Sequence, residues 1–126
     1  MGYANPKVRA TYGFTIDHGV AADVATSFKG PKGLTGKIRE ITSVASEVFT
    51  AGGLVKIGTT GDDGAYANFA LGTLAATDTL VATAQSGALI DEVLPADTQI
   101  EIVFAKVTLG ASGTGIADHS ITVDWF

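Results

Sequence analysis

The chain has 126 residues, contains no cysteine and carries a net charge of −5. This length is typical of one domain with its own core, and the lack of cysteine excludes disulfides and thiolate metal sites. The acidic balance argues against a nucleic-acid partner, because such binding needs a basic surface that displaces counterions. We therefore expect a single domain over residues 1–126, with residues 1–7 as an N-terminal arm.

The first half of the chain reads as strands. Residues 8–16 alternate apolar and polar side chains, and residues 20–28 repeat this period of two, which is typical of half-buried strands. The segment 29–33, KGPKG, ends the second strand, because proline lacks a ladder donor and glycine permits a reversal.

Residues 34–50 are ambiguous. Leu34, Ile38, Ile41, Val44 and Val48 follow a helical spacing. Most of the residues that would line such a helix are β-branched, however, and Gly36 interrupts the pattern early. We interpret the segment as a long strand or strand pair with a bulge near residues 39–41.

The second half contains further short strands. Apolar runs at 54–58, 79–84 and 88–93 are separated by turn residues, and residues 98–109 alternate clearly. The sequence GASGTG at 110–115 predicts a hairpin onto 116–126, where alternate residues share one side. About eight short strands predict an all-β fold, an antiparallel β-sandwich of jelly-roll type.

The stretch GTTGDDGAYANFALG at 58–72 resembles a ligand loop at first sight. A phosphate loop needs Gly-Lys followed by Ser or Thr, and an EF-hand needs alternating acids closed by a glutamate; Asp62 and Asp63 fit neither. We expect a structural connection with a short helical turn over 64–71, capped by one of these aspartates. No metal or other cofactor is expected.

The candidate catalytic residues do not form a constellation. His18 and His119 supply no ligand-spaced cluster, and Ser120 points to the opposite face of its strand from His119. Asp91 and Glu92 are neighbours on a strand and face apart. We therefore expect that the protein is not an enzyme. No segment reaches the ~18 apolar residues of a membrane span, so no membrane partner is expected.

Residues 30–126 resemble the small jelly-roll decoration, or cement, proteins of tailed bacteriophage capsids. The resemblance lies in the run of short strands, in VKIGTTGDDGAYA, and in the Gly-Thr-Gly turn before a terminal strand that ends in aromatic residues. It implies a homotrimer that binds the major capsid protein on the outer surface of the virion and bridges capsomers. A sugar-binding β-sandwich that uses Trp125, Tyr66 or Tyr12 as a platform is the alternative.

Charge and aromatic content suggest where contacts lie. Residues 1–56 hold seven Lys/Arg and four Asp/Glu, a net +3, whereas residues 57–126 hold one lysine and nine acids, a net −8. We expect the capsid to contact basic residues of the first half, namely Lys7, Arg9, Lys29, Lys32 and Lys37. The candidates for contacts between subunits are apolar or aromatic, namely Tyr66, Phe69, Val103, Trp125 and Phe126.

Overall fold

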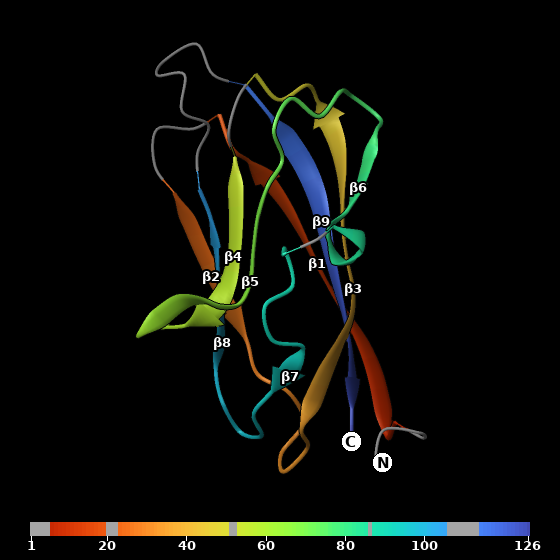
Figure 1. The fold of residues 1–126 in the computed structure, drawn as a ribbon, viewed down its shortest axis with the longest axis vertical. Helices are drawn as coiled ribbons and strands as arrows, with labels where there is room; N and C mark the ends of the chain where they lie inside the picture. The colour runs from red at the N-terminus through yellow and green to blue at the C-terminus, as the bar shows by residue number, and fades with distance from the viewer. Residues whose placement is uncertain (1–5, 20–22, 51–52, 86, 106–113) are drawn as a thin grey trace.

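The computed structural model describes residues 6–19, 23–50, 53–85, 87–105 and 114–126. The described chain folds into two facing β-sheets (Figure 1). Its elements are β1 (Val8–Asp17), β2 (Val24–Phe28), β3 (Gly36–Glu47), β4 (Leu54–Thr59), β5 (Asp62–Ala70), β6 (Thr79–Val81), the 3-10 turn η1 (Ala82–Ala84), β7 (Val93–Leu94), β8 (Ile100–Phe104) and β9 (Ile116–Trp125). No helix in these ranges is long and apolar enough to cross a membrane.

The strand order is that of a jelly roll. One sheet has the order β1-β9-β3-β6, with the two-residue β7 also paired to β3, and the other has the order β2-β8-β4-β5. When β7 is left out, the eight remaining strands are arranged 1-8-3-6 and 2-7-4-5, which is the order of two interlocked Greek keys. The predicted all-β sandwich is therefore confirmed.

The core lies between the sheets and follows the period of two. On β8, Ile100, Ile102 and Phe104 are buried while the residues between them are half-buried. On β9, the odd-numbered side chains from Ala117 to Trp125 are buried in the core, and the even-numbered ones are exposed or half-buried except Asp124. Each fully buried large apolar side chain contributes about 1.5–3 kcal/mol relative to exposure.

The ambiguous segment 34–50 forms one strand, β3, over Gly36–Glu47. Its register with β9 shifts between Ile38 and Glu40, so that Arg39 is the extra residue of a bulge. The predicted bulge is confirmed, and it explains the apparent helical spacing. One extra residue changes which face the strand buries, so that Ile38 and Ile41 both point into the core.

Three sequence predictions are wrong in part. The hairpin between 98–109 and 116–126 does not form, because β8 and β9 belong to different sheets; residues 106–113 lie outside the described part. The run 79–84 is a strand only as far as Val81 and continues as η1. The run 88–93 is a strand only at Val93, where β7 begins, and otherwise holds an isolated bridge between Leu89 and Ala67. Turn residues indicated correctly where the chain reverses, but they did not indicate whether it crosses from one sheet to the other.

The N-terminal arm expected over 1–7 is described only for residues 6 and 7. The Lys7 N–H donates to the carbonyl oxygen of Trp125 at 2.8 Å. Lys7 therefore lies at the start of β1, beside the end of β9.

Candidate functional site

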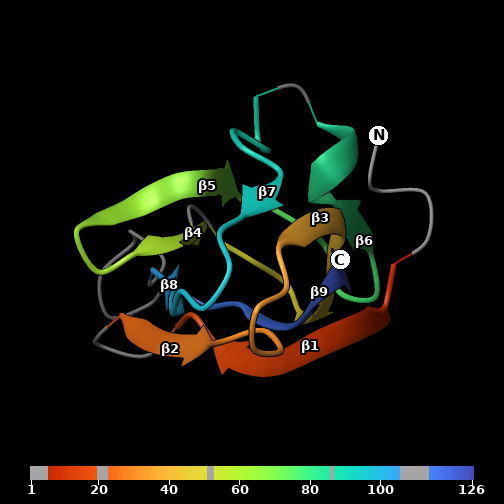
Figure 2. The ribbon, with the colours of Figure 1, turned by 90° about the horizontal axis from the view of Figure 1, so that it is seen from below.

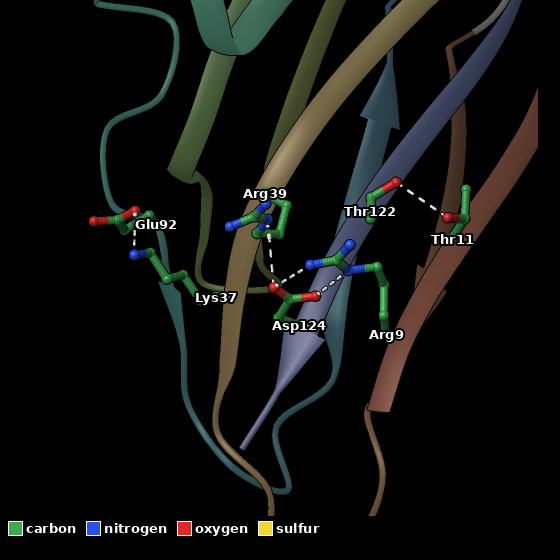
Figure 3. Close-up of polar contacts among 7 residues, drawn as sticks. All are labelled: Arg9, Thr11, Lys37, Arg39, Glu92, Thr122 and Asp124. Carbon is green, nitrogen blue, oxygen red and sulfur yellow. Dashed lines mark hydrogen bonds and ion pairs between the residues drawn. The ribbon is translucent and has the colours of Figure 1, made fainter. Parts of the chain in front are cut away.

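The outer face of the β1-β9-β3-β6 sheet carries a charged cluster around Asp124 (Figure 3). Arg9 lies opposite Asp124 in the register and binds its carboxylate through Nε, 2.6 Å from Oδ1, and Nη2, 3.1 Å from Oδ2. From the other side, Arg39 Nε lies 3.3 Å from Oδ2. The bulge in β3 brings Arg39 there. Flanked by both arginines, the Asp124 side chain is only 4% exposed although it lies on an outer face.

This arrangement fixes the charge of the cluster. The hydrogen bond from Arg9 lowers the pKa of Asp124, and the same bond raises the pKa of Arg9. Two cations therefore share one anion at neutral pH. The arginine side chains remain about half exposed, so donors that Asp124 does not use face solvent. Sequence reasoning selected Arg9 but missed Asp124 and Arg39, because only the pairing of β9 with β1 and β3 brings them together.

The surface around the cluster is shallow and rich in small residues. A pocket of about 220 Å³ is lined by Arg9, Arg39, Glu40 and Thr122. Glu40 offsets the positive charge there, so this pocket is not an evident anion site. The neighbouring outward positions of β1 and β9 hold small polar residues or glycine, namely Thr11, Gly13, Thr15, Ser120 and Thr122. Such a face is better suited to another protein surface than to a small ligand.

The predicted basic residues gather at one end of the sandwich. The start of β1, the segment between β2 and β3, and the start of β3 all lie at the end where β9 finishes (Figure 1). Lys7, Lys29 and Lys32 are exposed there, while Lys37 Nζ lies 3.8 Å from Glu92. Acidic residues also occupy this end, so the local field is weaker than the count of lysines suggests.

A chain of hydrogen bonds is buried at the other end of β1. His18 Nδ1 lies 2.8 Å from the carbonyl oxygen of Ala105, and His18 Nε2 lies 2.9 Å from His119 Nε2. His119 Nδ1 is in turn 2.7 Å from Ser43 Oγ. All three side chains are at most 1% exposed. Ser43 could not be recognised from the sequence, because it reaches His119 across the β3–β9 register rather than along the chain.

The bonding pattern dictates the protonation of both histidines. A carbonyl oxygen only accepts, so His18 Nδ1 carries a proton and its Nε2 accepts from His119 Nε2–H. His119 Nδ1 then accepts from the Ser43 hydroxyl. Burial lowers the pKa of both rings, and the neighbouring His18 lowers that of His119 further, to about 3. The pair is neutral at physiological pH, and Ser43 is buried with it.

The stretch 58–72 is a β-hairpin, and the predicted helical turn over 64–71 is wrong. Strands β4 and β5 pair with a register shift between Ile57 and Thr59. A Cβ at Gly58 would collide with the backbone of Asp62 and Asp63, so the bulge requires glycine there. Buried Ala67 and Phe69 follow the two-residue period of β5, while Tyr66 is buried on the opposite face of the strand. Lys56 Nζ lies 3.7 Å from Asp63 Oδ2, and the described residues contain no metal-ligating group of three.

Most of the aromatic candidates lie inside the sandwich. Trp125, Tyr66 and Phe69 are 1%, 7% and 5% exposed, whereas Val103 and Phe126 are half-buried. Gly30 and Gly36 cover the Trp125 ring so closely that neither position has room for a Cβ. Trp125 and Tyr66 thus offer no ring face to a sugar. Tyr12 is half-buried and stacks on Phe28, with ring centroids 4.1 Å apart.

No family model and no curated protein matches this chain. Among solved structures, it is similar to a chain of a cyanophage Pam1 capsid asymmetric unit, with 14% sequence identity and a TM-score of 0.40. The alignment covers 89% of this chain and 85% of that chain. At this identity and TM-score the similarity carries no argument about function.

Proposed function

We propose that this protein is a capsid decoration protein, which binds the outer surface of a phage head as a homotrimer and stabilises the shell by bridging capsomers. The observation that carries the proposal is the agreement between the sequence resemblance and the strand order. The resemblance over residues 30–126 implies a jelly roll, and β1 to β9 are arranged as one. Fold alone does not define function, so the surface must also fit the role.

The chemistry of the described residues favours a structural role over a catalytic one. The His119–Ser43 pair has the atoms of a nucleophile and base, but both side chains are buried and neutral. The pocket beside Arg9 holds no comparable pair. We therefore infer that the protein acts by binding other proteins rather than by catalysis.

The basic end is the surface that we expect to contact the capsid protein. Lys29 and Lys32 are exposed, and no ion pair engages either of them within the described residues. Complementary charge would speed encounter with an acidic shell and orient the protein, while apolar contacts supply most of the affinity. A single exposed ion pair contributes only about 0–1 kcal/mol.

Contacts between three subunits require exposed apolar surface. Among the described residues, Val44, Val48, Val81 and Ile90 are 38%, 47%, 36% and 60% exposed. Val44 and Val81 lie on neighbouring strands, because Val81 pairs with Thr42 in the β3–β6 register. These side chains, with the half-buried Val103 and Phe126, are the apolar positions that a homotrimer interface could cover.

Binding to undecorated shells of the parent phage tests the docking surface. We expect K29E/K32E to slow association and to lower the temperature at which decorated shells break open, measured by light scattering and electron microscopy. The matched control N68E/T73E/A75E/A76E changes the net charge by the same four units at exposed positions of β5 and of the segment that follows it. Equal binding by both variants, at all salt concentrations, would reject this docking surface. Failure of the wild-type protein to bind shells would reject the decoration role itself.

A further inference from the structure

The first strand, β1, is a long sheet edge that pairs with β9 alone among the described strands. It ends the order β1-β9-β3-β6 and runs for ten residues along the margin of the molecule (Figure 2). The other edges are short or covered. β6 has three residues and β2 has five, and β5 is covered by the segment around Leu89, which bonds to Tyr66 and Asn68.

Antiparallel geometry shows which backbone groups of β1 are free. The His18 N–H donates to the carbonyl oxygen of Gly115 at 2.7 Å, so the even-numbered residues of β1 form the hydrogen-bonded pairs with β9. The odd-numbered residues direct their N–H and C=O groups towards the open edge. These are Arg9, Thr11, Gly13, Thr15 and Asp17, and no backbone hydrogen bond within the described residues engages those groups.

The inward side chains of β1 are also incompletely covered. Ala10, Tyr12, Phe14 and Ile16 point into the core yet are only half-buried, whereas the residues that they face on β9 are almost fully buried. Natural edge strands usually carry a proline, an inward charge or a bulge that discourages pairing. The register of β1 with β9 runs from Val8 to Asp17 without any of these.

We propose that β1 pairs antiparallel with β1 of a second copy of this chain, about a two-fold axis at Gly13. This register places Arg9 opposite Asp17 of the second copy and Thr11 opposite Thr15, both on the outer face. On the inner face Tyr12 meets Phe14, and Ala10 meets Ile16. In this register only odd-numbered residues form hydrogen-bonded pairs. These are the residues whose N–H and C=O groups face the open edge. The side chains, the charges and the free backbone groups of β1 are thus all self-complementary about a two-fold axis at Gly13.

The pairing joins two five-stranded sheets into one continuous sheet and covers the exposed rims of Tyr12 and Phe14. The pairing uses only the β1 edge, whereas Val44 and Val81, which we named for the homotrimer interface, lie on β3 and β6 at the other edge of the sheet, so the pairing can link one trimer to another. It is also independent of capsid binding, since it concerns the isolated protein. The chain contains no native cysteine, which makes site-specific cross-linking unambiguous.

Three cysteine variants test the register. In the proposed pair the Gly13 positions face each other at about 5.5 Å between Cα atoms, whereas the two Thr15 positions lie roughly 14 Å apart because they are offset by four residues. A Cβ at Gly13 meets only a backbone oxygen at 3.9 Å, so G13C retains its packing. With bis-maleimidoethane we expect covalent dimers of G13C and of T11C/T15C, but not of T15C alone. Equal linking of T15C and G13C, or no linking of G13C at millimolar protein, would overturn the proposal.

Amide hydrogen exchange supplies a readout that needs no mutation. On raising the protein concentration, protection should increase at the amides of Thr11, Gly13 and Thr15. The amides of Tyr12 and Phe14, which already bond to β9, should change little. A concentration-independent pattern at all five amides would contradict pairing with a second copy and would leave the edge to a strand of another protein.

Discussion

Acid should destabilise this protein through the buried histidine pair, beginning near pH 6.5. His119 has a pKa of about 3 in the folded protein, against 6.5 in an unfolded chain. A group with a lowered folded pKa binds its proton more readily when unfolded. For a histidine, the resulting stability is complete above pH 6.5 and is lost as the pH falls towards 3.

The size of the effect follows from the two pKa values. Between pH 6.5 and 3, a histidine that stays neutral in the folded protein lowers the free energy of unfolding by about 1.4 kcal/mol for each unit that the pH falls. At pH 4.5 His119 alone therefore removes roughly 2.7 kcal/mol, a large part of the ~5–15 kcal/mol typical of a domain. His18 acts in the same direction, because burial lowers its pKa as well. Protonation of both rings would also set two N–H groups against each other across the 2.9 Å contact.

Urea unfolding followed by tryptophan fluorescence at several pH values between 7.5 and 4.5 measures this loss. We expect the unfolding midpoint of the wild type to fall steeply below pH 6.5. The double variant H18Q/H119N should be less stable at pH 7.5 but nearly independent of pH down to 4.5. Asp124 does not interfere, because its lowered pKa contributes stability above about pH 3.8 that is lost only at lower pH. Parallel pH dependence of wild type and double variant would refute the role of the histidine pair.

Three further outcomes are expected. G36A should lower stability by about 1–3 kcal/mol, because its Cβ would stand 2.6 Å from the Trp125 ring, whereas G61A, with open space around it, should be nearly neutral in the same thermal melts. D124N should lower the melting temperature most at low salt, since it leaves Arg9 and Arg39 without their shared anion; a larger loss at high salt would contradict this. Chelation with EDTA should leave the melting temperature unchanged, and a drop reversed by calcium would require Asp62 and Asp63 to be ligands.

The periodicity of the sequence predicted the structural features that depend on residues close together along the chain. The alternation over 8–16 located β1 and its inward face, and β-branched content decided correctly for a strand at 34–50. The bulge was predicted near residues 39–41, and it lies at Arg39. In contrast, the helical turn over 64–71 was wrong, because a few apolar positions four apart also fit the two-residue period of β5.

What the sequence did not predict depends on pairing between distant strands. Ser43 and His119 are 76 positions apart and Arg9 and Asp124 are 115 apart, and each pair meets only because β9 lies between β1 and β3. The turn residues before β9 indicated a reversal, but a hairpin and a crossover to the other sheet share the same local signals. The buried histidines were therefore treated as isolated, and Asp124 was not recognised at all.

The position of β9 also explains why β1 is the strand available to a partner. β9 lies between β1 and β3, with His119 and Trp125 pointing inward and Asp124 outward. Displacing β9 would therefore break the hydrogen bonds of His119, the packing of Trp125 under the glycines and the ion pairs of Asp124 together. β1 is held by β9 on one side only, and its inward side chains are half-buried. Pairing at the β1 edge adds hydrogen bonds and covers apolar surface without disturbing any contact of β9. The fold therefore concentrates its stability in β9 and leaves its self-complementary surface on β1.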